Sequence, residues 1–296
     1  MKVIGLFTIM VLLFGLSLDR QSVAATSTLQ FAVIGDYGWG DANEAAVAAL
    51  VKSWNPAFII TVGDNNYPLG ESTTIDDHIG KYYAEYIYPY TGAYTATATT
   101  NRFYPTLGNH DWYTPGATPY LNYFSSPINN RYYDFVQGPI HFFALDSDPN
   151  EPDGISITAT QAIWLHSQLA ASTSCWNLVY LHHAPYSSAS HGSNPTLQWD
   201  YRQWGADAVF AGHDHVYERI DVGGIPYFVD GAGGAPLYSF GTPVAGSQFR
   251  ASVFGAMRVT ATSSQITYEF ISTDGTTLDT SIQNGGCAIF LPVVLR

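Results

Sequence analysis

Residues 211–219, AGHDHVYER, place two histidines on either side of a carboxylate at the end of an apolar run. The run itself, residues 208–210, has the composition of a buried strand. Along an extended chain, side chains two residues apart point to the same side, and neutral imidazole nitrogens there can bind a metal ion. A His-x-His pair in a surface turn is a common alternative. Other parts of the chain decide between the two.

Four further apolar runs end in the same manner, in glycine, in a polar residue that can bind a ligand, or in both. They lead into Gly35-Asp36-Tyr37-Gly38, Gly63-Asp64-Asn65-Asn66-Tyr67, Gly108-Asn109-His110-Asp111 and His182-His183. Ligands bind at the carboxyl ends of strands in α/β sheets, and glycine lets the backbone turn sharply beside a ligand. Each stretch alone also suits a helix cap or an ordinary turn. Their joint occurrence predicts one shared rim.

The residue types on this predicted rim restrict the metals that it can hold. Carboxylates, a phenol, an amide oxygen and imidazoles are present, and no thiol is among them. Hard and borderline ligands of this kind suit iron, zinc or manganese.

The elements that must position these loops alternate between apolar β-rich runs and longer helical patterns, which predicts an α/β fold. We predict strands at residues 29–34, 58–62, 104–107, 140–145, 178–181 and 208–210, and helices at 43–54, 75–88 and 160–170. Residues 257–282 read as hairpin strands, with Asp274-Gly275 as a turn. The absence of repeats and long linkers predicts a single domain over residues 28–283.

Both ends of the chain carry features outside this domain. Lys2 precedes an apolar stretch over residues 3–18 and a small-residue pattern at 22–25, which is typical of a secretory signal peptide over residues 1–24. The stretch is shorter than the ~20 residues that a bilayer span needs, so we expect an exported protein without a membrane span in its mature chain. Residues 284–296 form a tail that suits either a last strand or a sorting signal. Export permits a disulfide between Cys175 and Cys287.

The charge of the chain limits the partners that it can bind. Its formal net charge is −13, and loss of residues 1–24 would make it −14, because that segment carries one net positive charge. Nucleic-acid binding through a basic surface is disfavoured. A small anionic substrate would need a strong local positive charge, which bound metal ions can supply.

Taken together, the five blocks resemble the signature of the calcineurin-like metallophosphoesterases. The block ending in Tyr67 is similar to that of the purple acid phosphatases, and the length of the chain suits the small single-domain type. The resemblance implies a four-layer α/β/β/α sandwich of two mixed sheets flanked by helices.

The same resemblance implies a site with two metal ions. Asp64 would bridge them. The other ligands would be Asp36, Tyr67 and His215 for Fe(III), and Asn109, His182 and His213 for Fe(II), Zn(II) or Mn(II). Counting the anionic ligands and one hydroxide, such a centre keeps a charge of about +1, which can attract an anionic ester to an acidic protein.

The resemblance also implies a secreted acid phosphatase that hydrolyses small phosphate monoesters by direct attack of a metal-bound hydroxide. His110 and His191 would protonate the leaving group, and Asp111 would orient the ring of His110. His183 remains an alternative to His191 in that role and to His182 as a ligand. A phosphodiesterase, nuclease-like or acting on cyclic nucleotides, and a non-catalytic binding protein are the alternative functions. Oligomeric state is left open.

Overall fold

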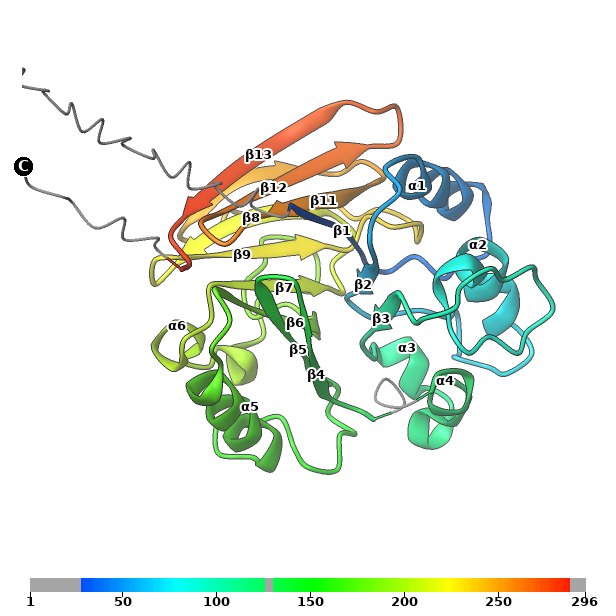
Figure 1. Cartoon of the computed structure of the whole chain (residues 1–296), viewed down its shortest axis with the longest axis horizontal. Helices are drawn as coiled ribbons and strands as arrows, with labels where there is room; N and C mark the ends of the chain where they lie inside the picture. The colour runs from blue at the N-terminus through cyan, green and yellow to red at the C-terminus, as the bar shows by residue number, and fades with distance from the viewer. Residues whose placement is uncertain (1–27, 126–129, 288–296) are drawn as a thin grey trace, which may run out of the picture.

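The computed structural model describes residues 28–125 and 130–287. The predicted signal peptide, and all of the tail after residue 287, lie outside the described residues. Within them, two mixed sheets form the centre of the molecule (Figure 1).

The first sheet combines a parallel and an antiparallel half. Strands β1, β2 and β3 run parallel, and β11 to β13 continue the sheet antiparallel from the other side of β1. Its order is β13 (Thr277–Asn284), β12 (Gln265–Ser272), β11 (Gly255–Ala261), β1 (Leu29–Ile34), β2 (Ile59–Thr61) and β3 (Phe103–Pro105).

The second sheet is built around parallel strands β5, β6, β7 and β9, with antiparallel neighbours at both ends. Its order is β10 (Ser247–Ala251), β8 (Tyr217–Val222), β9 (Ile225–Asp230), β7 (Ala208–Gly212), β6 (Trp176–His183), β5 (Ile140–Ala144) and β4 (Tyr133–Gln137).

Aromatic side chains join the two sheets face to face. Phe31 of β1 meets the edge of Phe142 of β5 with 5.1 Å between ring centroids, and Phe58 contacts both rings. Because side chains alternate along a strand, the residues next to Phe31 in β1 and next to Phe142 in β5 point to the outer faces of the sheets.

Helices cover both outer faces. Helix α1 (Ala42–Ser53) is capped by Asp41, whose carboxylate accepts the N–H groups of Asn43 and Glu44, and it packs against β11. On the other side, α5 (Thr160–Ala171) buries Leu165 and Leu169 among residues of β5, β6 and β7. Figure 1 shows α5 and α6 (Tyr201–Trp204) on the side opposite α1. The expected four-layer α/β/β/α sandwich is confirmed.

The segment over residues 75–88 departs from the single helix that its sequence predicts. It forms a π-helical turn (Asp76–Gly80), α2 (Lys81–Tyr83) and a 3-10 turn (Ala84–Tyr86). Asp76 is bound by the hydroxyls of Tyr90 and Tyr123, so tertiary contacts override the local helical pattern. The remaining short helices are α3 (Asn109–Trp112), α4 (Thr118–Tyr123) and the 3-10 turns Pro115–Ala117 and Pro195–Leu197.

A disulfide joins Cys175, at the start of β6, to Cys287, beyond β13, across a sequence separation of 112 residues. Replacing both cysteines with serine is expected to lower the free energy of unfolding by roughly 2–5 kcal/mol, because the bond restricts the unfolded chain. Urea unfolding of the oxidised wild type and of the double variant measures this. An unchanged midpoint would contradict it, and reductant should affect the wild type alone.

In the described residues, no helix has both the length and the apolar composition needed to cross a membrane.

Candidate metal site

Loops from both sheets meet at the carboxyl ends of β1, β2, β3, β6 and β7. The backbone N–H of His213 donates to Asp36 Oδ2 at 2.9 Å, although the two residues lie 177 positions apart. The ring of His182 reaches the carbonyl of Val62 at 2.9 Å, which ties β6 of one sheet to β2 of the other. The predicted shared rim is therefore present in the structure.

Asp36, Asp64, Tyr67 and His215 form the first cluster of the rim. The Tyr67 hydroxyl oxygen lies 3.1 Å from Asp36 Oδ1, 2.9 Å from Asp64 Oδ2 and 3.1 Å from His215 Nε2. His215 Nε2 lies 3.4 Å from Asp36 Oδ1. One hydroxyl proton cannot serve three acceptors, so this buried cluster has more acceptor atoms than donors. A cation would satisfy it.

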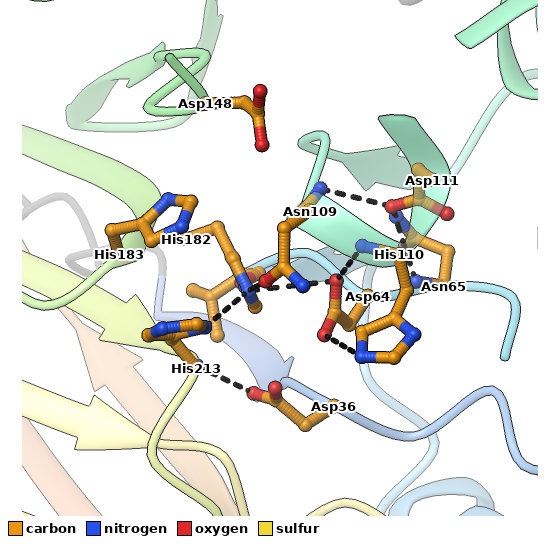
Figure 2. Close-up of polar contacts among 12 residues, drawn as sticks. Asp36, Asp64, Asn65, Asn109, His110, Asp111, Asp148, His182, His183 and His213 are labelled. Carbon is orange, nitrogen blue, oxygen red and sulfur yellow. Dashed lines mark hydrogen bonds and ion pairs between the residues drawn. The ribbon is translucent and has the colours of Figure 1, made fainter. Parts of the chain in front are cut away.

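Asn109, His182 and His213 form the second cluster, and Asp64 touches it as well. His182 Nε2 lies 3.0 Å from Asn109 Oδ1, 3.2 Å from His213 Nδ1 and 3.5 Å from Asp64 Oδ1. Figure 2 shows Asn109, His182 and His213 pointing toward one another beside Asp64. Asp64 thus faces one cluster with each of its oxygens.

Backbone carbonyls orient two of the imidazoles. His182 Nδ1 donates to Val62 O, and His215 Nδ1 donates to the carbonyl of Pro236 at 2.8 Å. A carbonyl accepts only, so Nδ1 carries the proton and Nε2 of the neutral ring has a lone pair directed into the site. Metal-binding histidines in proteins are commonly oriented in this way.

Burial favours the neutral form of three of these groups, which suits metal binding by the imidazoles but not by the carboxyl of Asp36. It lowers the pKa of His182 and of His213 below that of an ordinary histidine, which keeps both rings neutral. It also raises the pKa of Asp36 to about 6, because a charged carboxylate is poorly solvated there. Two groups in the described residues could hold a metal ion: Asp36 with Asp64 and His215, and His182 with His183 and His213.

The backbone is strained at three of these residues. Asp36, Asp64 and His213 have φ values of 53°, 52° and 70°, a region that non-glycine residues rarely adopt. Gly63, with a φ of 91°, precedes Asp64, and a Cβ there would lie 2.6 Å from His182 Nδ1. Strain of this kind is typical of functional sites.

His110 lies at the edge of the first cluster. Its ring packs on Tyr67 with 4.2 Å between centroids, and its Nε2 is 3.9 Å from Asp64 Oδ2. About a quarter of its side chain is exposed, so this imidazole is accessible from solvent.

The orienting role predicted for Asp111 is not seen. The ring of His110 is held through Nδ1 by the carbonyl of Pro68 at 2.6 Å. Asp111 Oδ2 instead accepts the backbone N–H of Gly108 and the side-chain amide of Asn65, at 2.9 and 2.8 Å. Asp111 is the third helical residue after Gly108, so its side chain turns back to the helix start and away from the ring. Asp111 therefore fixes the loops, and Pro68 fixes the histidine.

The raised pKa of Asp111 predicts how the stability of the protein depends on pH. Burial raises the pKa of its carboxyl from 3.8 to about 7, so the folded chain takes up this proton more readily than the unfolded chain. Its contribution to stability is therefore lost as pH rises from about 4 to about 7. With metal chelated, Asp111→Asn, which stays neutral, is expected to be more stable than wild type at pH 8 by on the order of 1–4 kcal/mol.

Urea unfolding of both proteins at pH 4.5 and pH 8 measures this difference. A variant that is less stable than wild type at pH 8 would contradict the prediction.

The other histidines named from the sequence also lie here. His191 stacks on His213 with 4.0 Å between ring centroids, and His183 packs against His213 at 4.4 Å. The ring of His183 contacts the Ser147 hydroxyl through Nδ1 at 3.0 Å. His182 is the better candidate ligand of the adjacent pair, because it alone contacts Asn109 and Asp64.

One loop was missed by the sequence reasoning. It follows β5, where the Ser147 hydroxyl accepts the backbone N–H groups of His182 and His183 at 3.2 and 2.8 Å. Figure 2 shows Asp148 of this loop above Asn109 and His183, and its side chain is buried. The sequence pattern that could have predicted this loop is Asp-Ser-Asp directly after the strand predicted at 140–145, since polar residues also follow the strands that lead into the other loops.

The fold and this arrangement of loops define the class of protein. Residues 29–217 match the model of the calcineurin-like phosphoesterase family, and the chain belongs to that family. Within the family the similarity is to the purple acid phosphatases, as the sequence resemblance indicated. The chain is 25% identical over 266 residues to human tartrate-resistant acid phosphatase type 5, an alignment that covers 77% of this chain and 80% of the relative. It is 26% identical to purple acid phosphatase 17 of Arabidopsis thaliana, over 77% and 75% of the two chains.

Solved structures show the same fold. The purple acid phosphatase PPD1 of yellow lupin superposes with a TM-score of 0.70 at 19% identity, over 88% of this chain and 54% of that one. GAP50, described as the anchor in the inner membrane complex of Plasmodium, gives 0.69 at 20% identity, over 87% and 89%. Since an anchor shares the fold, function has to be argued from the site.

Proposed function

We propose that the protein is an acid phosphatase that hydrolyses small phosphate monoesters at a site holding two metal ions. The observation that carries this proposal is Asp64, whose oxygens each face a separate cluster of ligand-type side chains, Tyr67 on one side and His182 on the other. A carboxylate shared in this way is suited to bridging two cations.

The residues fit the two ions in the division that the family resemblance implies. Asp36, Tyr67 and His215 complete one set of ligands with Asp64, and Asn109, His182 and His213 complete the other. When bound, two metal ions supply positive charge for the phosphoryl group and activate water as a nucleophile. The chain contributes the neutral imidazoles and the fixed carboxylates that hold such ions in place.

His110 and His191 are the proposed proton donors to the leaving group. Their rings lie against different clusters, with His110 packed on Tyr67 and His191 stacked on His213. A protonated imidazole beside a bound ester can donate its proton to the departing oxygen. These two imidazoles, one half-buried and one exposed, are open to a substrate and support catalysis over a purely structural or binding role.

Iron is proposed for the cluster that contains Tyr67, because a phenolate favours a hard trivalent ion. Fe(II), Zn(II) or Mn(II) is proposed for the other cluster. Metal analysis and a visible spectrum test this assignment. A purple or pink colour that disappears in Tyr67→Phe supports it, whereas a colourless protein containing two zinc ions would overturn the iron assignment.

The activity is tested by comparing an aryl phosphate monoester with the matching diester, using metal-loaded and chelated protein. Faster turnover of the monoester, lost on chelation, supports the proposal. Faster turnover of the diester would replace it with a phosphodiesterase. No turnover of either ester by fully loaded protein would favour a non-catalytic binding protein.

Export is part of the proposal. The disulfide between Cys175 and Cys287 supports it, because such bonds persist in oxidising compartments. Detection of the mature N-terminus near residue 25 in the exported protein would test it, and retention of residues 1–24 would contradict it.

A further inference from the structure

A loop that carries His191 (residues 187–192, the His191 loop) lies beside the site without any helix or strand of its own. His191 is exposed, yet its ring stacks on His213 at an interplanar angle of 25°. A loop of this kind needs contacts to hold one conformation, since its backbone makes few regular hydrogen bonds. The residues that make those contacts determine the position of the His191 ring.

The first set of contacts comes from Asp214, the residue between the two histidines of the opening motif. Its carboxylate is fully buried. It accepts the backbone N–H of His191 at 2.8 Å and that of Gly192 at 3.2 Å, together with the hydroxyl of Ser187. Three donors from the His191 loop thus converge on one carboxylate.

The second set comes from Glu218, four residues further along the chain and also fully buried. Its carboxylate accepts the backbone N–H of Ser188 at 2.7 Å and the Ser188 hydroxyl at 2.5 Å. It also accepts the hydroxyl of Ser247 of β10. Hydrogen bonds to buried carboxylates are stronger than those between neutral groups.

These two carboxylates belong to the same segment as His213 and His215. Asp214 lies in the turn after β7, and Glu218 lies in β8. The segment that presents two candidate metal ligands therefore also fixes the loop that presents His191, so the position of this imidazole is set relative to the ligands themselves. Neither the metal-ligand set nor the leaving-group residues assigned above include Asp214 or Glu218.

We propose that Asp214 and Glu218 are positioning residues that hold His191 at the site and thereby set how well poor leaving groups are expelled. This inference rests on the proposed function. An alkoxide needs a proton more than a nitrophenolate does, so help from a general acid matters more for alkyl esters. Misplacing His191 should then affect the two kinds of ester differently.

Asp214→Asn tests this directly. His191 N–H bonds to Oδ1 and Gly192 N–H to Oδ2, so in either orientation the amide NH2 would face one of these donors instead of accepting from it, and the loop should lose its fixed position. We expect kcat for an alkyl ester such as glycerol phosphate to fall roughly tenfold to a hundredfold, and kcat for nitrophenyl phosphate to change less than about threefold. In a His191→Ala background the same substitution should have no further effect on either ester.

Two readouts other than activity accompany the rates. Metal content should stay at the wild-type value, and the NMR signals of the His191 ring should shift in Asp214→Asn. Asp279→Asn is the matched control, because Asp279 is a buried carboxylate that binds Tyr217 and Arg219 away from the His191 loop. It should leave both the ratio of the two rates and the His191 signals unchanged.

If Asp214→Asn does not fold, Ser188→Ala removes a donor to Glu218 and should change the rate ratio in the same direction. Equal losses for both esters, full additivity with His191→Ala, or loss of metal would overturn the positioning role. If the wild type hydrolyses neither ester, the proposed function fails. Unchanged His191 signals in Asp214→Asn would separately overturn the inference that Asp214 holds His191 in place.

Discussion

Replacement of Asp64 with asparagine is expected to remove both metal ions and to lower kcat/KM for a phosphate monoester by at least about a thousandfold. The carboxylate is buried and approaches Tyr67 and His182 at 2.9 and 3.5 Å, so an amide there removes the one negative charge that the two clusters share. Without bound metal, neither the activated water nor the clamp on phosphate is available.

Metal content per chain and steady-state rates measure this loss, with Asp279→Asn as the control for replacing a buried carboxylate elsewhere. If Asp64→Asn keeps two metals and more than about a tenth of the activity, Asp64 does not bridge them.

For His110→Ala we expect kcat to fall by roughly 10² to 10⁴, the usual cost of losing a general acid, with both metals still bound. The ring lies against Tyr67 and 3.9 Å from Asp64 without being part of either cluster, so its removal leaves the candidate ligands intact. The loss should be larger for alkyl than for nitrophenyl esters.

His166→Ala is the matched control, because His166 lies in α5 and its ring stacks on Trp204 of α6, outside both clusters. Unchanged turnover in His110→Ala would remove His110 from the leaving-group role, and loss of metal would show that its role is structural.

Much of the central fold was readable from the sequence because its strands are continuous apolar runs. β1 and β5 were predicted to within one residue, and β7 was predicted with the correct start but two residues too short. The strands that escaped are β4, β8, β9 and β10. Charged or polar residues interrupt β4, β8 and β10, and Pro226 lies within β9. In β8, the buried Glu218 is satisfied by serines, and the half-buried Arg219 is paired with Asp279. Those partners are distant in sequence.

The convergence of the site could be predicted for a similar reason. The strand ends could be recognised one by one, and the carboxyl edge of a sheet brings them together. The backbone carbonyls that orient the imidazole rings could not be recognised from the sequence. The carbonyl groups that hold His182, His215 and His110 belong to Val62, Pro236 and Pro68, and a backbone carbonyl leaves no trace in residue type. The role predicted for Asp111 was wrong because helical geometry turned its side chain away.

The disulfide described with the fold closes a covalent ring of chain between residues 175 and 287. His182, His191, His213 and His215 all lie inside this ring. A protease that cuts once within it would produce two polypeptides that stay linked through sulfur, with the four imidazoles still attached to one molecule. Such nicked protein should migrate as one species on a non-reducing gel and as two after reduction.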